Sequence, residues 1–158
     1  MTAAAPIPPV APGDWPIRIL VTGWRAWPWA HARIVHDTLA LWAAQLRGDH
    51  ERRPIIVVHG RCPYGGVDLY ADEWARAQGP LVWPEPHEAP WASMGKRAGM
   101  VRNQHMVNLG ASVCLAFPGP LVDPMKPGGT RNCIGLATAA GIYVNTIEWS
   151  DQFEAQKR

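Results

Sequence analysis

The chain has 158 residues, the length of one domain, and is long enough to bury a core without metal or disulfide staples. Its net charge is only +2, which excludes the broad positive field of a protein that grips duplex nucleic acid. Three cysteines without a Cys-x-x-Cys pair argue against a disulfide framework or a zinc site, and no apolar run approaches membrane-spanning length. We therefore expect a cytoplasmic protein that holds no metal and no other cofactor and does not associate with membranes.

Both ends of the chain differ in composition from its middle. Residues 1–15 are rich in proline and alanine and predict a flexible arm, because proline fits neither a helix interior nor an interior strand. Residues 148–158 are predicted as a polar C-terminal tail with room for one further helical turn. The folded domain is therefore expected over residues 16–147.

Strands and helices are expected to alternate along this domain. Two short β-branched runs, at 17–22 and 55–58, lead into glycine-containing turns and predict buried parallel strands. The segment between them is predicted as a helix over 32–46, because one stripe at helical spacing holds Ile34, Val35, Thr38, Leu39, Trp42 and Leu46. The pattern then predicts helices at 67–78, 99–109 and 130–140, which alternate with strands at 81–83, 113–117 and 142–145.

This alternation predicts an α/β fold, namely a single Rossmann-like domain with three αβα layers and a mostly parallel sheet of about five strands. In such doubly wound sheets, ligands bind at the carboxyl edge, where the strand order reverses. Four loops follow strands and should converge on that edge, at 23–28, 60–66, 84–102 and 118–130.

The segment 126–130, Lys-Pro-Gly-Gly-Thr, falls between an apolar strand and a helix of small residues. Gly128 and Gly129 let backbone amides approach an anion, Thr130 can cap the helix, and the helix dipole favours negative charge. The segment predicts a phosphate site, although a turn that only joins two elements has the same composition.

The first loop has one glycine, Gly23, in place of the Gly-x-Gly-x-x-Gly fingerprint, which argues against a standard hydride-transfer enzyme. Arg25 can bind an anion bidentately, and one of Trp24, Trp27 and Trp29 can stack on a nucleobase. Each tryptophan can equally cover the sheet edge or a subunit contact. Of the three, we assign only Trp24 to the site.

The second loop repeats the order of strand, glycine-rich turn and helix, with Gly60, Gly65 and Gly66 in the turn. Asp68 in the first helical turn either offsets the helix dipole, worth about 1 kcal/mol at most, or receives a ribose hydroxyl. We interpret His59 as a structural residue, because the sequence nearby supplies no partner that would orient its ring.

The third loop is long and carries Lys96, Arg97 and Arg102, with Asn103 beside Arg102 at the start of a helix. A long charged loop in a compact domain is often a binding loop, although it can be a solvated surface. Arg102 is the strongest candidate, because it can reach a phosphate at the Pro-Gly-Gly turn. Asp68 and Arg102 are the candidates for a catalytic role.

Four sets of residues stand in a fixed order between residues 17 and 145. They are Arg-Ile-Leu-Val-Thr-Gly-Trp-Arg-Ala-Trp at 18–27, Val-His-Gly and Gly-Gly-Val-Asp at 58–60 and 65–68, Gly-Met-Val-Arg-Asn at 99–103, and Ala-Phe-Pro-Gly and Pro-Gly-Gly-Thr at 116–119 and 127–130. Together they resemble the SLOG superfamily of Rossmann-like domains, which includes DprA, the LOG phosphoribohydrolases and the YspA-like proteins. The chain is most similar to the YspA-like branch.

The resemblance implies a nucleotide or nucleotide-derived ligand, such as a nucleoside monophosphate or an ADP-ribose-like molecule, bound or sensed at the carboxyl edge. By position, the family's pocket corresponds to Gly23, Arg25, Gly60, Asp68, Arg102, Asn103, Gly128, Gly129 and Thr130. We add as ligand-binding candidates Trp24, Gly65, Gly66, Pro118 and Gly119. Related families commonly form dimers, so we also expect a homo-oligomer.

The chain departs from the LOG pattern at Cys133. The LOG enzymes that it resembles have a glutamate at this position, and that glutamate serves hydrolysis of an N-glycosidic bond. A thiol cannot replace that carboxylate, so catalysis is uncertain and a binding role leads. The enzyme alternative is a nucleotide N-glycosidase that uses Asp68, Asp123 or Glu73 instead. DprA-like binding of single-stranded DNA through Lys96, Arg97, Arg102 and exposed tryptophans is the least favoured, because the net charge is small.

Overall fold

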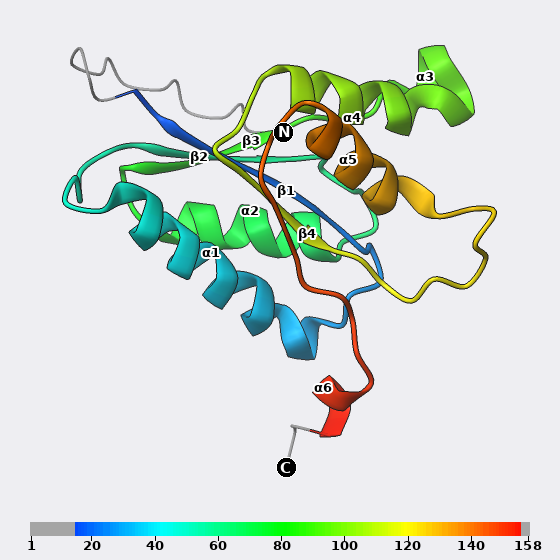
Figure 1. Ribbon diagram of the computed structural model, residues 1–158, viewed down its shortest axis with the longest axis horizontal. Coiled ribbons are helices and arrows are strands. Elements are labelled where there is room, and N and C mark those ends of the chain that lie inside the picture. The colour runs from blue at the N-terminus through cyan, green and yellow to red at the C-terminus, as the bar shows by residue number, and fades with distance from the viewer. Residues whose placement is uncertain (1–14, 156–158) are drawn as a thin grey trace.

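The computed structural model describes residues 15–155, which form one α/β domain around a five-stranded sheet (Figure 1). All strand pairs are parallel, and the strand order is β3-β2-β1-β4-β5. The strands are β1 (Ile17–Gly23), β2 (Ile55–His59), β3 (Val82–Pro86), β4 (Val113–Phe117) and β5 (Val144–Thr146). The predicted fold class is confirmed, with a sheet that is wholly parallel. The predicted N-terminal arm lies outside the described residues except for Trp15.

Helices cover both faces of the sheet, which gives the three predicted layers. Helices α1 (Ala32–Arg47) and α2 (Val67–Ala77) lie on one face, and α4 (Ala98–Asn108) and α5 (Gly128–Ala139) lie on the other (Figure 1). Short helical segments complete the described chain: η1 (Trp29–His31), α3 (Trp91–Met94), η2 (Gly95–Arg97) and α6 (Gln152–Ala155).

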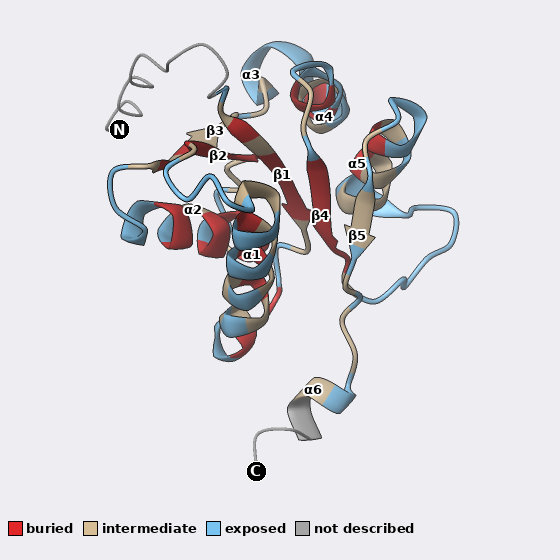
Figure 2. Cartoon of the chain, turned by 60° about the vertical axis from the view of Figure 1, so that its left-hand side comes forward, coloured by how far each residue is buried: buried red, intermediate tan, exposed pale blue. Residues whose placement is uncertain are grey.

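The side chains of β1 supply two separate cores, because successive residues of a strand point to opposite faces. Ile19 and Val21 pack into the core under α1 and α2. Leu20 packs into the core under α4 and α5, with Met106 and Ala137. Figure 2 shows the consequence, since the central strands are buried along most of their length while the four long helices bury only their inner faces. The continuous apolar runs of β1, β2 and β4 follow from burial on both faces.

Strand β3 is longer than the sequence predicts, because it continues through Pro84 and Pro86. A proline has no backbone N–H to donate, so it does not fit an interior strand, which is hydrogen-bonded to a neighbouring strand on each side. Strand β3 pairs only with β2, so it is an edge strand and tolerates both prolines. The segment predicted as a loop over 84–102 therefore holds the end of β3, α3, η2 and the first half of α4.

The segment after β5 packs onto the carboxyl end of the sheet. Its backbone follows β4, with N–H groups of Ile147 and Trp149 donating to the carbonyls of Ala116 and Pro118 at 2.8 and 2.9 Å. The Trp149 ring meets the buried Trp27 ring edge to face, with centroids 5.1 Å apart. The tail forms the predicted single helical turn, α6, but its aromatic residues make it part of the packed domain.

The strand order reverses at β1, which pairs with β2 on one side and β4 on the other. The loops that follow β1 and β4 therefore leave the sheet in opposite directions and open a crevice between them. The Trp24 N–H donates to the Phe117 carbonyl at 2.9 Å and ties the two loops together at its base.

Candidate functional site

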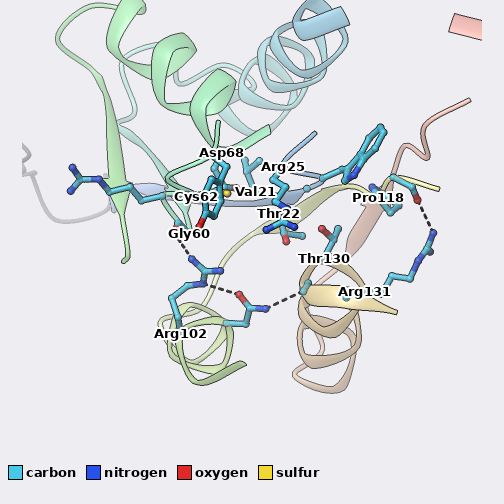
Figure 3. A pocket seen from close by; sticks show the side chains of 18 of the residues that line it. Val21, Thr22, Arg25, Gly60, Cys62, Asp68, Arg102, Pro118, Thr130 and Arg131 are labelled. Carbon is cyan, nitrogen blue, oxygen red and sulfur yellow. Dashed lines mark hydrogen bonds between the residues drawn. The ribbon is translucent and has the colours of Figure 1, made fainter. Parts of the chain in front are cut away.

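A pocket of about 440 Å³ occupies this crevice at the carboxyl ends of β1 and β4. It is lined by residues from all four loops that the sequence predicts to converge, so that prediction is confirmed. Twelve of the fourteen ligand-binding candidates line it: Gly23, Trp24, Arg25, Gly60, Asp68, Arg102, Asn103, Pro118, Gly119, Gly128, Gly129 and Thr130. Figure 3 shows Thr130 facing Thr22, while the Arg131 side chain turns toward the segment that begins at Pro118.

The Pro-Gly-Gly segment forms the beginning of α5 and one wall of the pocket. Gly128 has φ +87°, a conformation that favours glycine. Gly129 lies outside that region, and a Cβ built on it would meet no atom within 4 Å. Packing in the described structure therefore gives no reason for glycine at 129, while exposed helix amides beside open space are a suitable anion site.

Thr130 does not cap this helix, contrary to the prediction. The helix begins at Gly128, with Pro127 in the cap position and no side-chain hydrogen bond to the cap. Thr130 is thus a residue of the first helical turn. Its hydroxyl lies at the pocket wall, where Figure 3 shows the side chain directed toward Thr22.

Trp24 and Arg25 extend from the end of β1 into the rim of the pocket. The Trp24 indole lies against the Cα of Gly119, where any side chain would collide with it. Its ring is also 6.0 Å from the Trp149 ring. The Arg25 guanidinium lies 5.4 Å from the centre of the Tyr64 ring, a cation–π arrangement that leaves its donors available at the rim.

Trp27 and Trp29 do not belong to the site. Trp27 is 1% exposed and donates from Nε1 to the His31 carbonyl at 3.0 Å. Trp29 is 81% exposed in η1 and does not line the pocket. Trp24 is therefore the only member of this trio in the pocket wall, as we assigned it.

Gly65 and Gly66 shape the second loop but do not line the pocket, contrary to our assignment. Both have positive φ, +91° and +75°. A Cβ on Gly66 would also overlap the backbone of Arg25. These glycines therefore allow the loops after β1 and β2 to pack closely and begin α2 beside the pocket.

Asp68 is a buried carboxyl in the pocket wall, 7% exposed. Its Oδ2 accepts the backbone N–H of Cys62 at 3.1 Å, so the carboxyl closes the loop before α2. Burial raises the pKa of Asp68 above its usual value, against the opposing charges of His59 and Arg102. Such a carboxyl can accept a hydrogen bond from a ligand hydroxyl when it is ionised, and it can donate a hydrogen bond to a ligand when it is protonated.

Arg102 and Asn103 connect the second loop to α5. Arg102 donates through Nη1 to the Gly60 carbonyl and through Nε to Asn103 at 2.9 Å. Asn103, 2% exposed, donates to the Gly129 carbonyl at 3.0 Å and to Asn132 at 3.1 Å. Both residues lie in α4, which begins at Ala98, so Arg102 is held on the helix predicted over 99–109, one turn after its start.

His59 has the orienting partner that the sequence did not reveal. Its Nε2 lies 2.8 Å from Asp72 Oδ2, and its Nδ1 accepts the Arg61 N–H at 3.0 Å. Asp72 lies one helical turn after Asp68, and only folding brings it to the end of β2. His59 therefore anchors the second loop, in which Arg61 has φ +46°, a positive value rare outside glycine.

Cys133 lies beneath the pocket and does not line it. It is fully buried beside Cys114 of β4, and a hydrogen bond with Cys133 together with burial raises the pKa of Cys114. Both cysteines are free thiols, as is Cys62. This buried thiol of α5 packs against β4 and does not reach the pocket.

The sequence did not single out eleven of the lining residues, among them Arg61, Tyr64, Trp91 and Arg131. Arg131 directly follows the Pro-Gly-Gly-Thr motif and donates to the Gly119 carbonyl at 3.1 Å, so its position beside the motif could have indicated it. Arg61 and Tyr64 stand in the glycine-rich second loop. Trp91 carried no such signal, because α3 approaches the pocket only through the fold.

The remaining charged candidates lie elsewhere. Lys96 and Arg97 are exposed in η2, Glu73 is exposed on α2, and Asp123 accepts the N–H of Met125 in an exposed turn. None of the four lines the pocket. Asp68 is thus the only carboxyl of the enzyme alternative that reaches it.

Residues 15–155 have neither a metal-binding cluster nor a membrane-spanning helix. No cluster of three or more histidine, cysteine or acidic side chains is suited to hold a metal ion there. Within the same part of the chain, no helix is long and apolar enough to cross a bilayer.

Comparison with known proteins gives a relative from a bacteriophage. No family model matches the chain, and no solved structure matches it. This chain is 43% identical over 133 residues to the Gene 61 protein of Mycobacterium phage D29. The alignment covers 80% of this chain and 93% of the phage protein. The chain therefore belongs to the family of that phage Gene 61 protein.

Proposed function

We propose that this protein binds or senses a nucleotide or nucleotide-derived ligand, a nucleoside monophosphate or an ADP-ribose-like molecule, in the manner of the SLOG domains that it resembles. The observation that carries the proposal is the open face of Gly129 at the uncapped start of α5, within a 440 Å³ pocket at the reversal of strand order. Ligand pockets in open α/β sheets lie at this place and have this size.

The charges around the pocket support an anionic ligand. Four guanidinium groups line it, against the single carboxyl of Asp68. Guanidinium groups and helix amides together favour phosphate, and aromatic rings at the rim offer a surface for a base. The guanidinium groups belong to Arg25, Arg61, Arg102 and Arg131.

The first experiment is the thermal unfolding midpoint of the full chain with AMP, GMP, CMP, ADP-ribose, cyclic ADP-ribose and NAD. A ligand at about 100 times its dissociation constant adds about 2.7 kcal/mol of stability, which raises the midpoint by several degrees. A flat response across the panel would contradict the proposal.

A matched pair of glycine substitutions in α5 tests whether the ligand binds at the amides that begin this helix. Gly129→Ala adds a methyl group, in unoccupied space, to a residue of the pocket wall, and we expect it to weaken binding about tenfold by keeping phosphate from the amides. Gly135→Ala adds the same group to the exposed side of the same helix, also with no atom within 4 Å, and should leave binding unchanged. Equal affinities of the two variants would exclude the α5 amides as the anion site.

One observation favours the enzyme alternative, a nucleotide N-glycosidase. Asp68 is a buried carboxyl with a raised pKa, in the pocket and near Arg102, and such perturbed groups are frequent at catalytic sites. Any nucleotide that raises the midpoint should be tested for release of its base. Loss of release with retained binding in Asp68→Asn would support this activity, and absence of release in the parent protein would remove it.

The cytoplasmic location and the homo-oligomeric state remain proposals of the same kind. Sedimentation velocity of the full chain at two concentrations tests the second. A single species with the mass of one chain would contradict it.

A further inference from the structure

A second cavity of about 280 Å³ lies beside the first one. The two cavities share a wall made of Arg61, Cys62, Pro63 and Asp68, which line both. Figure 3 shows Cys62 and Asp68 on the side of the first pocket away from Thr130 and Arg131. A ligand whose phosphate lies at α5 can therefore extend across the first pocket toward the second cavity.

The far side of the second cavity is built by α2 and the end of β2. Asp72 accepts from His59 at 2.8 Å through Oδ2 and from Arg76 Nε at 2.5 Å through Oδ1. These bonds hold the carboxylate in place, and each of its oxygens keeps a lone pair for another donor. Arg76 is about half exposed, and its terminal nitrogens make no hydrogen bond within residues 15–155.

The charges of the two cavities differ in a way that identifies what each can hold. The first has four guanidinium groups and one carboxyl, which suits an anion. The second has two of each, Arg61 and Arg76 with Asp68 and Asp72, together with the buried His59. A balanced set of fixed acceptors and donors offers no net attraction for an anion. It matches sugar hydroxyls, because each hydroxyl both donates and accepts.

We infer that the second cavity is a subsite for a neutral sugar joined to the nucleotide in the first pocket. The ligand class is then a nucleotide that carries a second sugar, and a bare nucleoside monophosphate fills only part of the site. This inference rests on the proposed function, since it requires the nucleotide to occupy the first pocket.

The test compares AMP with ADP-ribose by isothermal titration calorimetry on the full chain. The parent protein should bind ADP-ribose at least tenfold more tightly than AMP. Leu69 lines the second cavity only and is 44% exposed, so Leu69→Trp should fill that cavity without reaching the first. We expect this variant to bind ADP-ribose no better than AMP, with its AMP affinity unchanged.

Leu41→Trp is the matched control, because Leu41 is also an exposed leucine on a helix of the same sheet face and is remote from both cavities. It should keep the full preference for ADP-ribose. Arg76→Ala gives an independent measurement and should also reduce that preference. Its control is Arg33→Ala, which breaks an equivalent pair four residues apart on α1.

The outcomes separate the two proposals. If the parent binds AMP and ADP-ribose equally, or if Leu69→Trp and Arg76→Ala both keep the preference, the second subsite is excluded and the nucleotide pocket stands. If the parent binds neither compound, both proposals fail. A tenfold preference that the two variants lose and the two controls keep establishes the sugar subsite.

Discussion

Single glycines divide into those that the fold requires and those that it does not. Gly66 combines a positive φ with a collision between any Cβ and the Arg25 backbone. Gly129 has neither constraint, and it lies in the pocket wall. The sequence shows both as parts of glycine pairs, so only the structure separates a glycine that shapes a loop from one beside open space.

Gly66→Ala should destabilise the protein by about 1–3 kcal/mol or more, because strain at φ +75° adds to overlap with backbone that cannot move aside. Urea unfolding measures this change. Gly135→Ala serves as the control, since it adds no contact in a helix and should stabilise by up to about 1 kcal/mol. Equal stability of the two variants would contradict the close packing of the loops after β1 and β2.

Asp68→Asn should stabilise the protein at neutral pH. Burial raises the pKa of Asp68 in the folded state, so the ionised carboxylate opposes folding above that pKa and the protonated form does not. The advantage of the variant should therefore shrink as the pH falls and vanish below about 3.8, the ordinary pKa. Urea unfolding of both proteins between pH 3 and 8 checks this, and a difference that does not depend on pH would contradict it.

At the scale of elements, the strands and helices follow from local pattern and the exceptions follow from position in the sheet. Prolines 84 and 86 argue against a strand in isolation, yet β3 accommodates them because it pairs on one side only. The predicted helix over 99–109 was one residue short at its start, and Arg102 lies inside it. Edge position and helix starts depend on neighbours that the local pattern does not contain.

The packing of the C-terminal segment can be tested with a pair of tryptophans. Trp149→Ala should cost about 2–3 kcal/mol, because its partly buried ring packs against Trp24, Trp27 and Phe153. Trp29→Ala removes an 81% exposed ring and should change stability by less than about 0.5 kcal/mol. Chemical unfolding of the two variants distinguishes this packing from a tail that is merely attached, for which both changes would be equally small.

At the scale of the whole molecule, one cluster joins strands that are not neighbours. Arg18 of β1 reaches past β2 to Glu85 of β3, with nitrogen to oxygen distances of 3.1 and 2.9 Å. His87 lies 2.8 Å from the same carboxylate. Hydrogen bonds from His87 and then Arg18 lower the pKa of Glu85 from 4.5 to about 2.

The stability that this cluster supplies is complete above pH 4.5 and should be lost as the pH falls through about 2, because the folded state then has to take up a proton that it disfavours. Glu85→Gln should remove on the order of 2 kcal/mol at pH 7 and flatten the acid limb of the stability curve. Glu51→Gln, at an exposed position, is the control. An acid limb that is unchanged in Glu85→Gln would show that other carboxylates dominate acid unfolding.

The sequence by itself determined the alternation of elements, the parallel sheet and twelve of the residues that line the pocket. Buried parallel strands read as apolar runs, and ligand loops follow their carboxyl ends, so both signals are local in the chain. Only the tertiary structure decided that Asp72 orients His59, that Arg102 is anchored on Gly60, that Trp91 reaches the pocket and that a second cavity lies behind Asp68. These contacts join residues of different elements, which the packing of helices against the carboxyl ends of the strands brings together.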